Sequence, residues 1–244
     1  MAPVPADGVL SASLHGFALE HTVGSAQSLH HRPIPDPVRP TIWWHDVAGP
    51  ALVLGSSQPD STIDLDACSR AGIEVVRRRS GGGAVLLVPG EVVWLDVIVP
   101  RRQDGGGDGG RDAGLDDVRG SMCRTGSHML DALVAAAPHL AGRLAVHRGP
   151  LESTAWSSTI CFDGLGPGEV TLDGEKLVGL SQRLTREAAR FQACWHTAYD
   201  PGALLELLPA GSGPAREALR PVATLDAAAS AAVPELLRAA LSTP

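Results

Sequence analysis

The chain has 244 residues, of which 44% are hydrophobic and 19% are charged, and its formal net charge is −7. Hydrophobic content of this size supports a globular core and excludes a disordered chain, and no apolar run is long enough to span a bilayer. The acidic balance argues against nucleic-acid binding, which needs a basic face.

The first half of the chain combines strand patterns with helical ones. Residues 11–22 carry apolar side chains at helical spacing and residues 30–40 are rich in proline, so a helix followed by an extended connection is expected. Residues 63–71 predict a second helix, which Gly72 closes. Strands are expected at 41–44, 51–54, 73–79, 84–88 and 92–99.

The second half begins with residues 103–114, whose polar, glycine-rich composition predicts a mobile surface loop. Residues 115–137 then predict a long helix that ends before Pro138. Strands are expected at 144–147, 159–162, 169–172, 176–182 and 188–195, and helices near 203–208 and 225–241. Strand-rich halves with intervening helices indicate the α+β fold class.

Cysteine usage indicates the compartment. Cys68, Cys123, Cys161 and Cys194 show neither the spacing of a disulfide framework nor that of a zinc site. No signal peptide is recognisable at the start of the chain. A cytoplasmic protein with reduced thiols and without a bound metal is therefore expected.

The most informative segment is RRRSGGGAV, at residues 77–85. Consecutive glycines let a ligand lie directly against main-chain N–H groups, and such groups form an anion-binding concavity. Flanking guanidinium groups add bidentate recognition of carboxylate or phosphate. The segment indicates either a ligand cradle or a glycine-rich hairpin whose arginines face solvent.

Together with DGEKLVGLSQ at residues 173–182, this segment resembles the lipoate–protein ligase and octanoyltransferase family. That family carries R-R-x-[ST]-G-G-[GR]-A-V and, later, D-G-[KR]-K-[IL]-x-G-S-A-Q. ALVLGSSQ at residues 51–58 and His196-Thr197 are similar to two further family elements, so the resemblance covers roughly residues 41–200. It implies a mixed β-sheet flanked by helices, of the biotin/lipoate protein ligase catalytic-domain type, with the site in a cleft beside the glycine loop.

The same resemblance implies three parts of the chain. Residues 1–40 would form an N-terminal helix and a proline-rich connection. Residues 41–205 would form the acyltransferase or ligase catalytic domain, and residues 206–244 a short C-terminal helical tail.

Lys176 and Cys161 are the candidate catalytic residues. Lys176 follows an Asp-Gly turn and opens an apolar strand, where an ammonium can stabilise the negative charge of an acyl-transfer transition state. Cys161 lies fifteen positions before Lys176, and Glu169 lies seven before it. This spacing is similar to that of the Gram-positive-type octanoyltransferases, the nearest subtype, in which the cysteine is the nucleophile. A buried, unreactive cysteine is the alternative.

The resemblance also implies substrates and partners. Cys161 would accept an octanoyl or lipoyl group from an acyl carrier protein as a thioester. The group would pass to a lysine of a lipoyl domain or of a glycine-cleavage H-type protein, and this route needs no cofactor. Residues expected to bind the substrate are Arg78, Ser80, Gly81, Gly82, Gly83, Ala84, Val85, Leu86, Gly179, Ser181 and His196.

Two other functions stay open. An ATP-dependent lipoate–protein ligase would need ATP with Mg²⁺ and would form an acyl-adenylate on the same loop. The chain departs from the family pattern at Leu87 and Val88, where the family often has His-Asp, and at Leu180, where a larger side chain enters the pocket wall. These departures allow a catalytically degenerate relative that only binds an acyl ligand or a partner.

Overall fold

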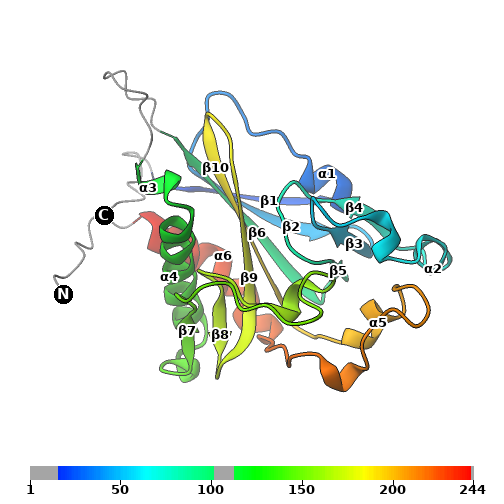
Figure 1. The fold of residues 1–244 in the computed structure, drawn as a ribbon. Coiled ribbons are helices and arrows are strands. Elements are labelled where there is room, and N and C mark those ends of the chain that lie inside the picture. Colours follow the sequence, from blue (N-terminus) through cyan, green and yellow to red (C-terminus); the bar gives the residue numbers. More distant parts are fainter. Residues whose placement is uncertain (1–15, 102–112, 243–244) are drawn as a thin grey trace.

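A seven-stranded sheet forms the centre of the computed structural model, which describes residues 16–101 and 113–242 (Figure 1). β1 and β2 pair in parallel, and each following neighbour is antiparallel. The strands, in spatial order, are β1 (Ala18–Gly24), β2 (Thr41–Val47), β6 (Val92–Pro100), β10 (Ala188–His196), β9 (Glu175–Leu184), β8 (Val170–Leu172) and β7 (Leu144–Val146).

A second, three-stranded sheet packs against one face of the first, with strand order β4 (Glu74–Arg77), β3 (Ala51–Leu54) and β5 (Val85–Leu87). Trp94 of the large sheet lies in one apolar cluster with Val53 and Leu87 of the small sheet. The small sheet therefore covers the large one across an apolar contact, with space for a cavity beside it.

Helices occupy the outer layers on both sides. They are α1 (Ala26–His30), α2 (Leu65–Arg70), α3 (Ala113–Asp116), α4 (Val118–Ala136), α5 (Pro201–Leu205) and α6 (Ala227–Ser242). Local signals explain several of their ends. Asp117 accepts a hydrogen bond from the Gly120 N–H at the start of α4, and Asp64 does the same for Ala67 in α2. None of the helices in the described ranges is long and apolar enough to cross a membrane.

The main core lies between the large sheet and the pair α4 and α6 (Figure 1). Phe191 and Trp195 of β10 are fully buried there against Leu133 of α4 and Leu237 of α6. Each such side chain contributes about 1.5–3 kcal/mol of burial free energy. Residues 206–244, expected to form a short helical tail, do contain a helix, and its apolar face is part of this core.

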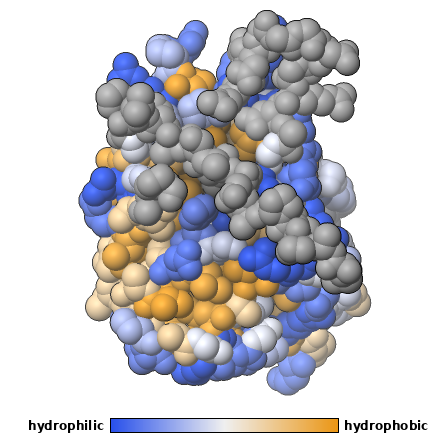
Figure 2. Space-filling view, turned by 90° about the vertical axis from the view of Figure 1, so that its left-hand side faces the viewer, coloured by the Kyte–Doolittle hydropathy of each residue, from blue (hydrophilic) through white to orange (hydrophobic). Residues whose placement is uncertain are grey.

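Figure 2 views the molecule from the side of this helical layer. An orange, apolar area is visible there among hydrophilic residues. Leu130 and Val134 of α4 and Leu236 of α6 are partly buried against the main core. These three side chains therefore bury only part of their apolar surface.

The fold differs from the predicted elements at the N-terminus. The prediction of a helix at 11–22 is wrong for the part that the structure describes, because Ala18–Gly24 form strand β1 beside β2. A few apolar residues cannot distinguish the period of a helix from that of a strand. Pairing with β2 provides hydrogen-bond partners for the main-chain groups. The loop expected at 103–114 lies almost entirely outside the described residues.

Two other differences have local causes. The strand expected at 159–162 is a turn that leads into a 3₁₀ segment, Cys161–Asp163. The N–H groups of Thr159 and Ile160 both donate to the carbonyl of Trp156, which closes the chain on itself. The helix expected at 115–137 is divided at Asp117, whose side chain caps α4.

Candidate functional site

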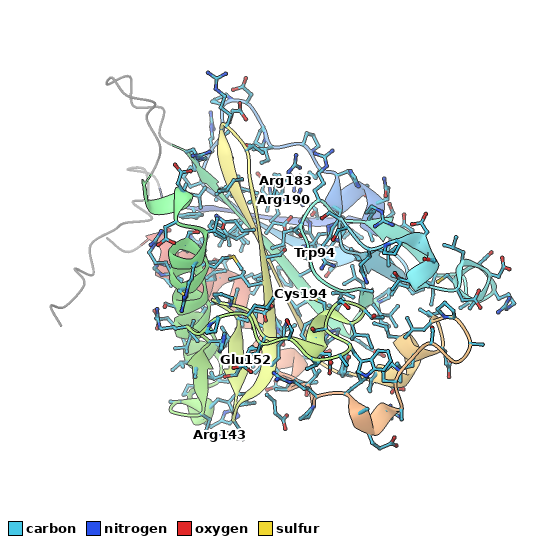
Figure 3. All side chains as sticks on the ribbon, in the orientation of Figure 1. Trp94, Arg143, Glu152, Arg183, Arg190 and Cys194 are labelled. Carbon is cyan, nitrogen blue, oxygen red and sulfur yellow. The ribbon has the colours of Figure 1, made fainter. Side chains whose placement is uncertain are left out.

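A cavity of about 450 Å³ lies between the two sheets. Its floor comes from alternate residues of the large sheet, where Gly179, Cys194 and Trp94 stand in one row across β9, β10 and β6. Val53 and Leu87 of the small sheet cover it. Figure 3 places Trp94 and Cys194 in the interior, between the sheets. The volume and the mainly apolar lining suit a small acyl ligand.

The glycine loop forms one wall of this cavity, and Arg78 organises the loop from within. Its guanidinium donates to the carbonyls of Gly81 (2.8 Å) and Gly83 (2.9 Å) and is buried, so it does not face solvent. Among the described residues, no acceptor is paired with the N–H groups of Gly81, Gly82 or Gly83. A loop with captured carbonyls and unpaired N–H groups is the arrangement of an anion-binding concavity.

Gly83 is required by a close approach of two backbones. A Cβ at this position would lie 2.7 Å from the main-chain N of Cys161 and from main-chain atoms of Ile160. Two hydrogen bonds join these two segments, from Ala84 N to Thr159 O (2.7 Å) and from Cys161 N to Ala84 O (3.0 Å). The loop therefore fixes the position of Cys161 directly.

We expect Gly83→Ala to lower the free energy of unfolding by about 1–3 kcal/mol, because the added methyl must displace the backbone that carries Cys161. Gly81→Ala is the matched control, since a Cβ there meets no atom within 4 Å. Chemical denaturation of both variants measures the difference. Equal stability of the two would show that the backbones can separate without cost.

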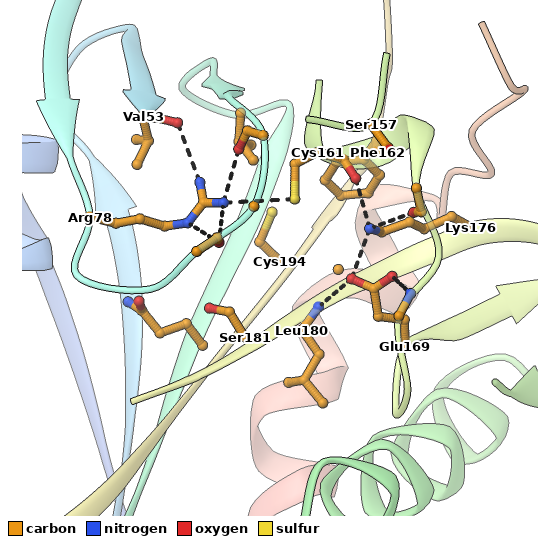
Figure 4. A pocket seen from close by; sticks show the side chains of 18 of the residues that line it. Val53, Arg78, Ser157, Cys161, Phe162, Glu169, Lys176, Leu180, Ser181 and Cys194 are labelled. Carbon is orange, nitrogen blue, oxygen red and sulfur yellow. Dashed lines mark hydrogen bonds and ion pairs between the residues drawn. The ribbon is translucent and has the colours of Figure 1, made fainter. Parts of the chain in front are cut away.

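Cys161 lines the cavity, and its sulfur lies between the side chains of Arg78 and Lys176 (Figure 4). The Arg78 Nη2 atom lies 3.9 Å from its Sγ. A Cβ at Gly82 would be 3.7 Å from the same sulfur, so the loop backbone is adjacent to it. Cys194 points toward Cys161 from the floor of the cavity. Burial raises the pKa of Cys194 to about 12, which keeps that second thiol protonated.

Lys176 is held by three acceptors at the other side of Cys161. Its Nζ donates to the carbonyls of Cys161 and Gly164 (both 3.0 Å) and lies 2.8 Å from the Glu169 carboxylate. Burial is the largest single influence and would lower the pKa of Lys176, but the charge and hydrogen bond of Glu169, together with neighbouring Cys161, outweigh it and raise the pKa above its ordinary value. The lysine is therefore a permanent ammonium within reach of the reacting region. To donate to an oxyanion, its Nζ must first release one of these three acceptors.

Glu169 is the functional residue that sequence reasoning left without a role. Besides Lys176, its carboxylate accepts hydrogen bonds from the N–H groups of Gly166 (2.7 Å) and Leu180 (3.2 Å). It thereby ties the segment that follows Cys161 to strand β9. The spacing of Glu169 before Lys176 was a signal for the pair, but spacing alone does not reveal an ion pair.

We expect Glu169→Gln to lower the free energy of unfolding by about 3–5 kcal/mol, because it leaves a buried ammonium without its counter-charge. Glu152→Gln is the control, since the Glu152–Arg220 pair is half exposed and should contribute only about 0–1 kcal/mol. Denaturation at pH 7 compares them. A loss no larger than the control's would contradict a stabilising role for the pair.

The raised pKa of Lys176 also sets the sign of a pH dependence. A group whose pKa is raised in the folded state stabilises that state below its unfolded pKa, so the contribution of Lys176 is complete at neutral pH. It should be lost as the pH rises beyond the ordinary lysine value of 10.5.

The inner wall of the cavity depends on buried Asp96. Its carboxylate accepts hydrogen bonds from Arg190 Nε and Trp94 Nε1 (both 2.9 Å) and from Gln192 Nε2 (3.1 Å). Burial alone would raise the pKa of Asp96, but the Arg190 charge lowers it. Arg190 also donates to the His30 carbonyl (3.0 Å), and the His30 ring packs on Trp94. Burial lowers the pKa of His30 to about 3, so this wall carries a neutral imidazole.

The predicted substrate-binding residues fall into two groups. Those that line the cavity, together with the two candidate catalytic residues, are Arg78, Gly81, Gly82, Gly83, Val85, Gly179 and Ser181. Three others do not line it. The Ser80 hydroxyl donates to that of Ser181 (3.1 Å), Ala84 is buried in the outer apolar cluster, and Leu86 packs against the same cluster.

His196, the remaining candidate, does not line the cavity. It is buried with its ring edge-on to Phe162, at 4.7 Å between centroids, and burial lowers its pKa to about 4. Phe162 in turn packs beneath the Lys176 ammonium, 5.0 Å from its ring centroid. His196 therefore supports the side chain that supports Lys176.

Several lining residues were not among the sequence candidates. Ser157, Ser158 and Leu151 precede Cys161 in the same loop, and Met122 reaches the cavity from helix α4. Nothing in their local sequence marks them as lining residues. Across the described residues, no group of three or more His, Cys, Asp or Glu side chains could hold a metal ion.

Comparison with known proteins gives a family match. The model of the lipoyl protein ligase A/B catalytic domain matches residues 26–227, which is most of the chain. A search of curated protein sequences gives no significant match.

Solved structures with the same fold include several lipoate protein ligases. A candidate lipoate protein ligase from Thermoplasma acidophilum with bound lipoic acid is 19% identical, with a TM-score of 0.58 over 93% of this chain and 81% of that chain. Lipoate-protein ligase A bound with ATP is 21% identical, with a TM-score of 0.53 and the same two coverages. A bipartite ligase from T. acidophilum, reported with its E2 lipoyl domain, is 19% identical, with a TM-score of 0.57 over 93% and 80%. The predicted fold, a mixed sheet flanked by helices, is confirmed.

Proposed function

We propose a specific reaction for this chain, which belongs to the lipoyl protein ligase A/B catalytic domain family and is an enzyme of protein lipoylation. It transfers an octanoyl or lipoyl group to a lysine of a lipoyl carrier domain through a thioester on Cys161. In this mechanism it is nearest to the Gram-positive-type octanoyltransferases.

One observation carries the proposal. The Cys161 thiol lines an acyl-sized cavity. The Arg78 guanidinium lies 3.9 Å from the Cys161 sulfur, and the Lys176 ammonium donates to the Cys161 carbonyl. Donors on both sides of the residue can stabilise the oxyanion that attack by its sulfur creates. Cys194 lines the same cavity without a guanidinium contact, and its raised pKa makes it a poor nucleophile.

The reaction would proceed in two balanced transfers. The Cys161 thiolate attacks the thioester carbonyl of an acyl carrier protein, the carrier thiolate leaves, and an acyl-enzyme thioester forms. The amine of the acceptor lysine then attacks this second thioester, loses a proton and releases the Cys161 thiolate as the amide forms. Oxyanions in both steps would be stabilised by Lys176 and by the unpaired N–H groups of Gly82 and Gly83.

An ATP-dependent ligase is the second candidate, and the unpaired N–H groups of Gly81–Gly83 favour it. These groups, with the Lys176 ammonium, fit the phosphate of an acyl-adenylate. ATP with Mg²⁺ would supply the activation of a free acid in that case. The solved relative that binds ATP supports this alternative.

Partners and compartment follow from the same proposal. The solved relative reported with its E2 lipoyl domain supports a lipoyl domain as acceptor, with a glycine-cleavage H-type protein as the other candidate. The donor would be an acyl carrier protein. Four cysteines without a disulfide fit a reducing cytoplasm.

Acylation of a purified lipoyl domain tests the proposal. The protein is incubated with octanoyl acyl carrier protein alone and, separately, with octanoate, ATP and Mg²⁺. We expect multiple turnovers in the first mixture. Turnover only in the second would establish the ligase instead, and turnover in neither would favour a relative that binds without catalysis.

A further inference from the structure

Lys176 is the only lysine of the chain, although lysine and arginine residues together number 20. An arginine guanidinium stays protonated and does not attack acyl groups, whereas a lysine amine attacks them once it has lost its proton. Lys176 itself is buried and is held as an ammonium by Glu169, so it is not a nucleophile. The chain therefore presents no lysine amine of its own to an activated acyl group. The amine that accepts the group must come from a partner.

The acyl cavity opens to solvent along two segments of the chain. Its exposed lining residues all belong to residues 81–82 of the glycine loop or to residues 151–158. We call residues 81–82 the glycine rim. Within the second segment Leu151 is 65% exposed, although it is a large apolar side chain. We call the lining residues around it the leucine rim, which consists of Met122, Leu151, Gly166 and Pro167.

The two rims lie on opposite sides of the Cys161 sulfur. The glycine rim lies beside Arg78, whose guanidinium donates to one of its carbonyls (2.8 Å). The leucine rim lies beside Glu169, because a Cβ at Gly166 would be 3.8 Å from both Leu151 and the Glu169 carboxylate. Figure 4 shows Arg78 and Glu169 on opposite sides of Cys161. A substrate group can therefore approach the sulfur from either rim.

The rims differ in charge. Among the described residues, Arg77 alone of the four arginines beside the glycine rim forms an ion pair with a carboxylate. Near the leucine rim, Glu169 and Glu152 each pair with one basic side chain. An approaching ammonium therefore meets an excess of positive charge at the glycine rim and balanced charge at the leucine rim. The four arginines line one hollow and are Arg77, Arg78, Arg79 and Arg183.

The shape of a lysine side chain also fits the leucine rim. Lysine carries its charged head on an aliphatic stem, which packs on apolar surface while the head keeps polar surroundings. Leu151, Met122 and Pro167 offer such a surface at the opening, and the polar groups around Cys161 lie beyond it. The glycine rim has no side chains and offers no comparable contact to the stem.

We infer that the acceptor lysine of a lipoyl domain reaches the acyl group over the leucine rim, and that the absence of surface lysines keeps the group from being transferred to this chain itself. The inference rests on the proposed function for the acyl-enzyme. The amine attacks the carbonyl of the Cys161 thioester, the C–N bond forms as the C–S bond breaks, and the amine proton passes to the released thiolate. The amide thus forms on the acceptor domain.

Lysines placed on each rim test the route. Leu151→Lys puts an amine on the leucine rim, and Gly81→Lys is the matched variant, because a Cβ at Gly81 meets no atom within 4 Å. Both variants and the unchanged protein are incubated with octanoyl acyl carrier protein without ATP. Intact-mass spectrometry follows before and after treatment with hydroxylamine, which cleaves thioesters and leaves amides.

We expect Leu151→Lys to acquire a hydroxylamine-resistant octanoyl group. Relative to the thioester in the same protein, this amide should form at least about 10-fold faster than in Gly81→Lys, because the introduced amine lies on the route of the acceptor. The unchanged protein should carry only the group that hydroxylamine removes, since its one lysine is a buried ammonium.

Transfer to a lipoyl domain supplies a second readout. Leu151→Arg puts a fixed positive charge on the leucine rim, whereas Leu151→Met keeps an apolar side chain there. Each variant is first loaded with the octanoyl group, and a single round of transfer to added lipoyl domain is followed. We expect Leu151→Arg to need at least about 10-fold more lipoyl domain for half-maximal transfer than Leu151→Met.

Three results would overturn the route: amide formation in Gly81→Lys as fast as in Leu151→Lys, a hydroxylamine-resistant group on Lys176 of the unchanged protein, or equal half-maximal concentrations for Leu151→Arg and Leu151→Met. A thioester on Cys161 without an amide in Leu151→Lys would refute the route and leave the proposed function standing.

Where no thioester forms, the two lysine variants are assayed with octanoate, ATP and Mg²⁺. Faster amide formation in Leu151→Lys than in Gly81→Lys would then refute the thioester mechanism and keep the route. The absence of any amide in both mixtures would overturn the route and the proposed function together.

Discussion

The double variant Lys176→Met, Glu169→Gln, which removes the buried ion pair, should lower the rate of acyl transfer by about 10²–10³-fold. The reason is that it removes a charged donor at the developing oxyanion. The double variant is needed because Lys176→Ala alone would leave the Glu169 carboxylate buried without a cation. Transfer to a lipoyl domain under saturating donor measures the effect.

Glu169→Gln alone is the reference for this experiment, since it keeps the Lys176 side chain while it removes the counter-charge. Circular dichroism and denaturation establish that both variants are folded. A double variant that is folded and transfers as fast as Glu169→Gln would remove Lys176 from the mechanism. The lysine would then be a structural support for the Cys161 turn.

Cys161→Ser should abolish ATP-independent transfer, because a serine hydroxyl without an adjacent base is a far weaker nucleophile than a thiolate. Cys194→Ser is the matched control, as it changes a second thiol in the same cavity. We expect that variant to keep most of its activity, since burial raises the pKa of Cys194 to about 12 and keeps it protonated.

The pair of cysteine variants also separates the two candidate mechanisms. A ligase that works through an acyl-adenylate should retain ATP-dependent transfer in Cys161→Ser. Loss of ATP-independent transfer in Cys194→Ser, with retention in Cys161→Ser, would mean that the nucleophile has been assigned to the wrong sulfur.

The sequence predicted the loop but not how its arginines are used. Unpaired N–H groups on three glycines agree with the expected cradle. Arg78 was expected to hold a ligand, yet it holds the carbonyls of Gly81 and Gly83. Its direction depends on those carbonyls and on the segment at Cys161, which are tertiary contacts that local composition does not encode.

The buried ion pairs show the same limit. Arg190 and Asp96 are 94 residues apart, and nothing in either local sequence links them. Their pairing holds the Arg190 guanidinium in the interior of the fold. The assignment of a helix at 11–22 was wrong for a different reason. The strand partner of Ala18–Gly24 lies in residues 41–47, beyond the reach of periodicity.

Strands of the central sheet were predicted best, because β-branched and apolar runs bounded by turns carry a local signal. The turn that presents Cys161 was predicted as a strand, since Thr159-Ile160-Cys161-Phe162 has strand-like composition. Backbone hydrogen bonds to Ala84 and Trp156 override that preference. The site thus depends on contacts between segments, while the scaffold follows local patterns.

Intact-mass spectrometry after incubation with octanoyl acyl carrier protein, without ATP, tests the thioester mechanism most directly. We predict a mass increase of one octanoyl group on the unchanged protein and on Cys194→Ser, none on Cys161→Ser, and release of the group when a lipoyl domain is added. An unmodified protein that acylates the lipoyl domain only with octanoate, ATP and Mg²⁺ would contradict the acyl-enzyme.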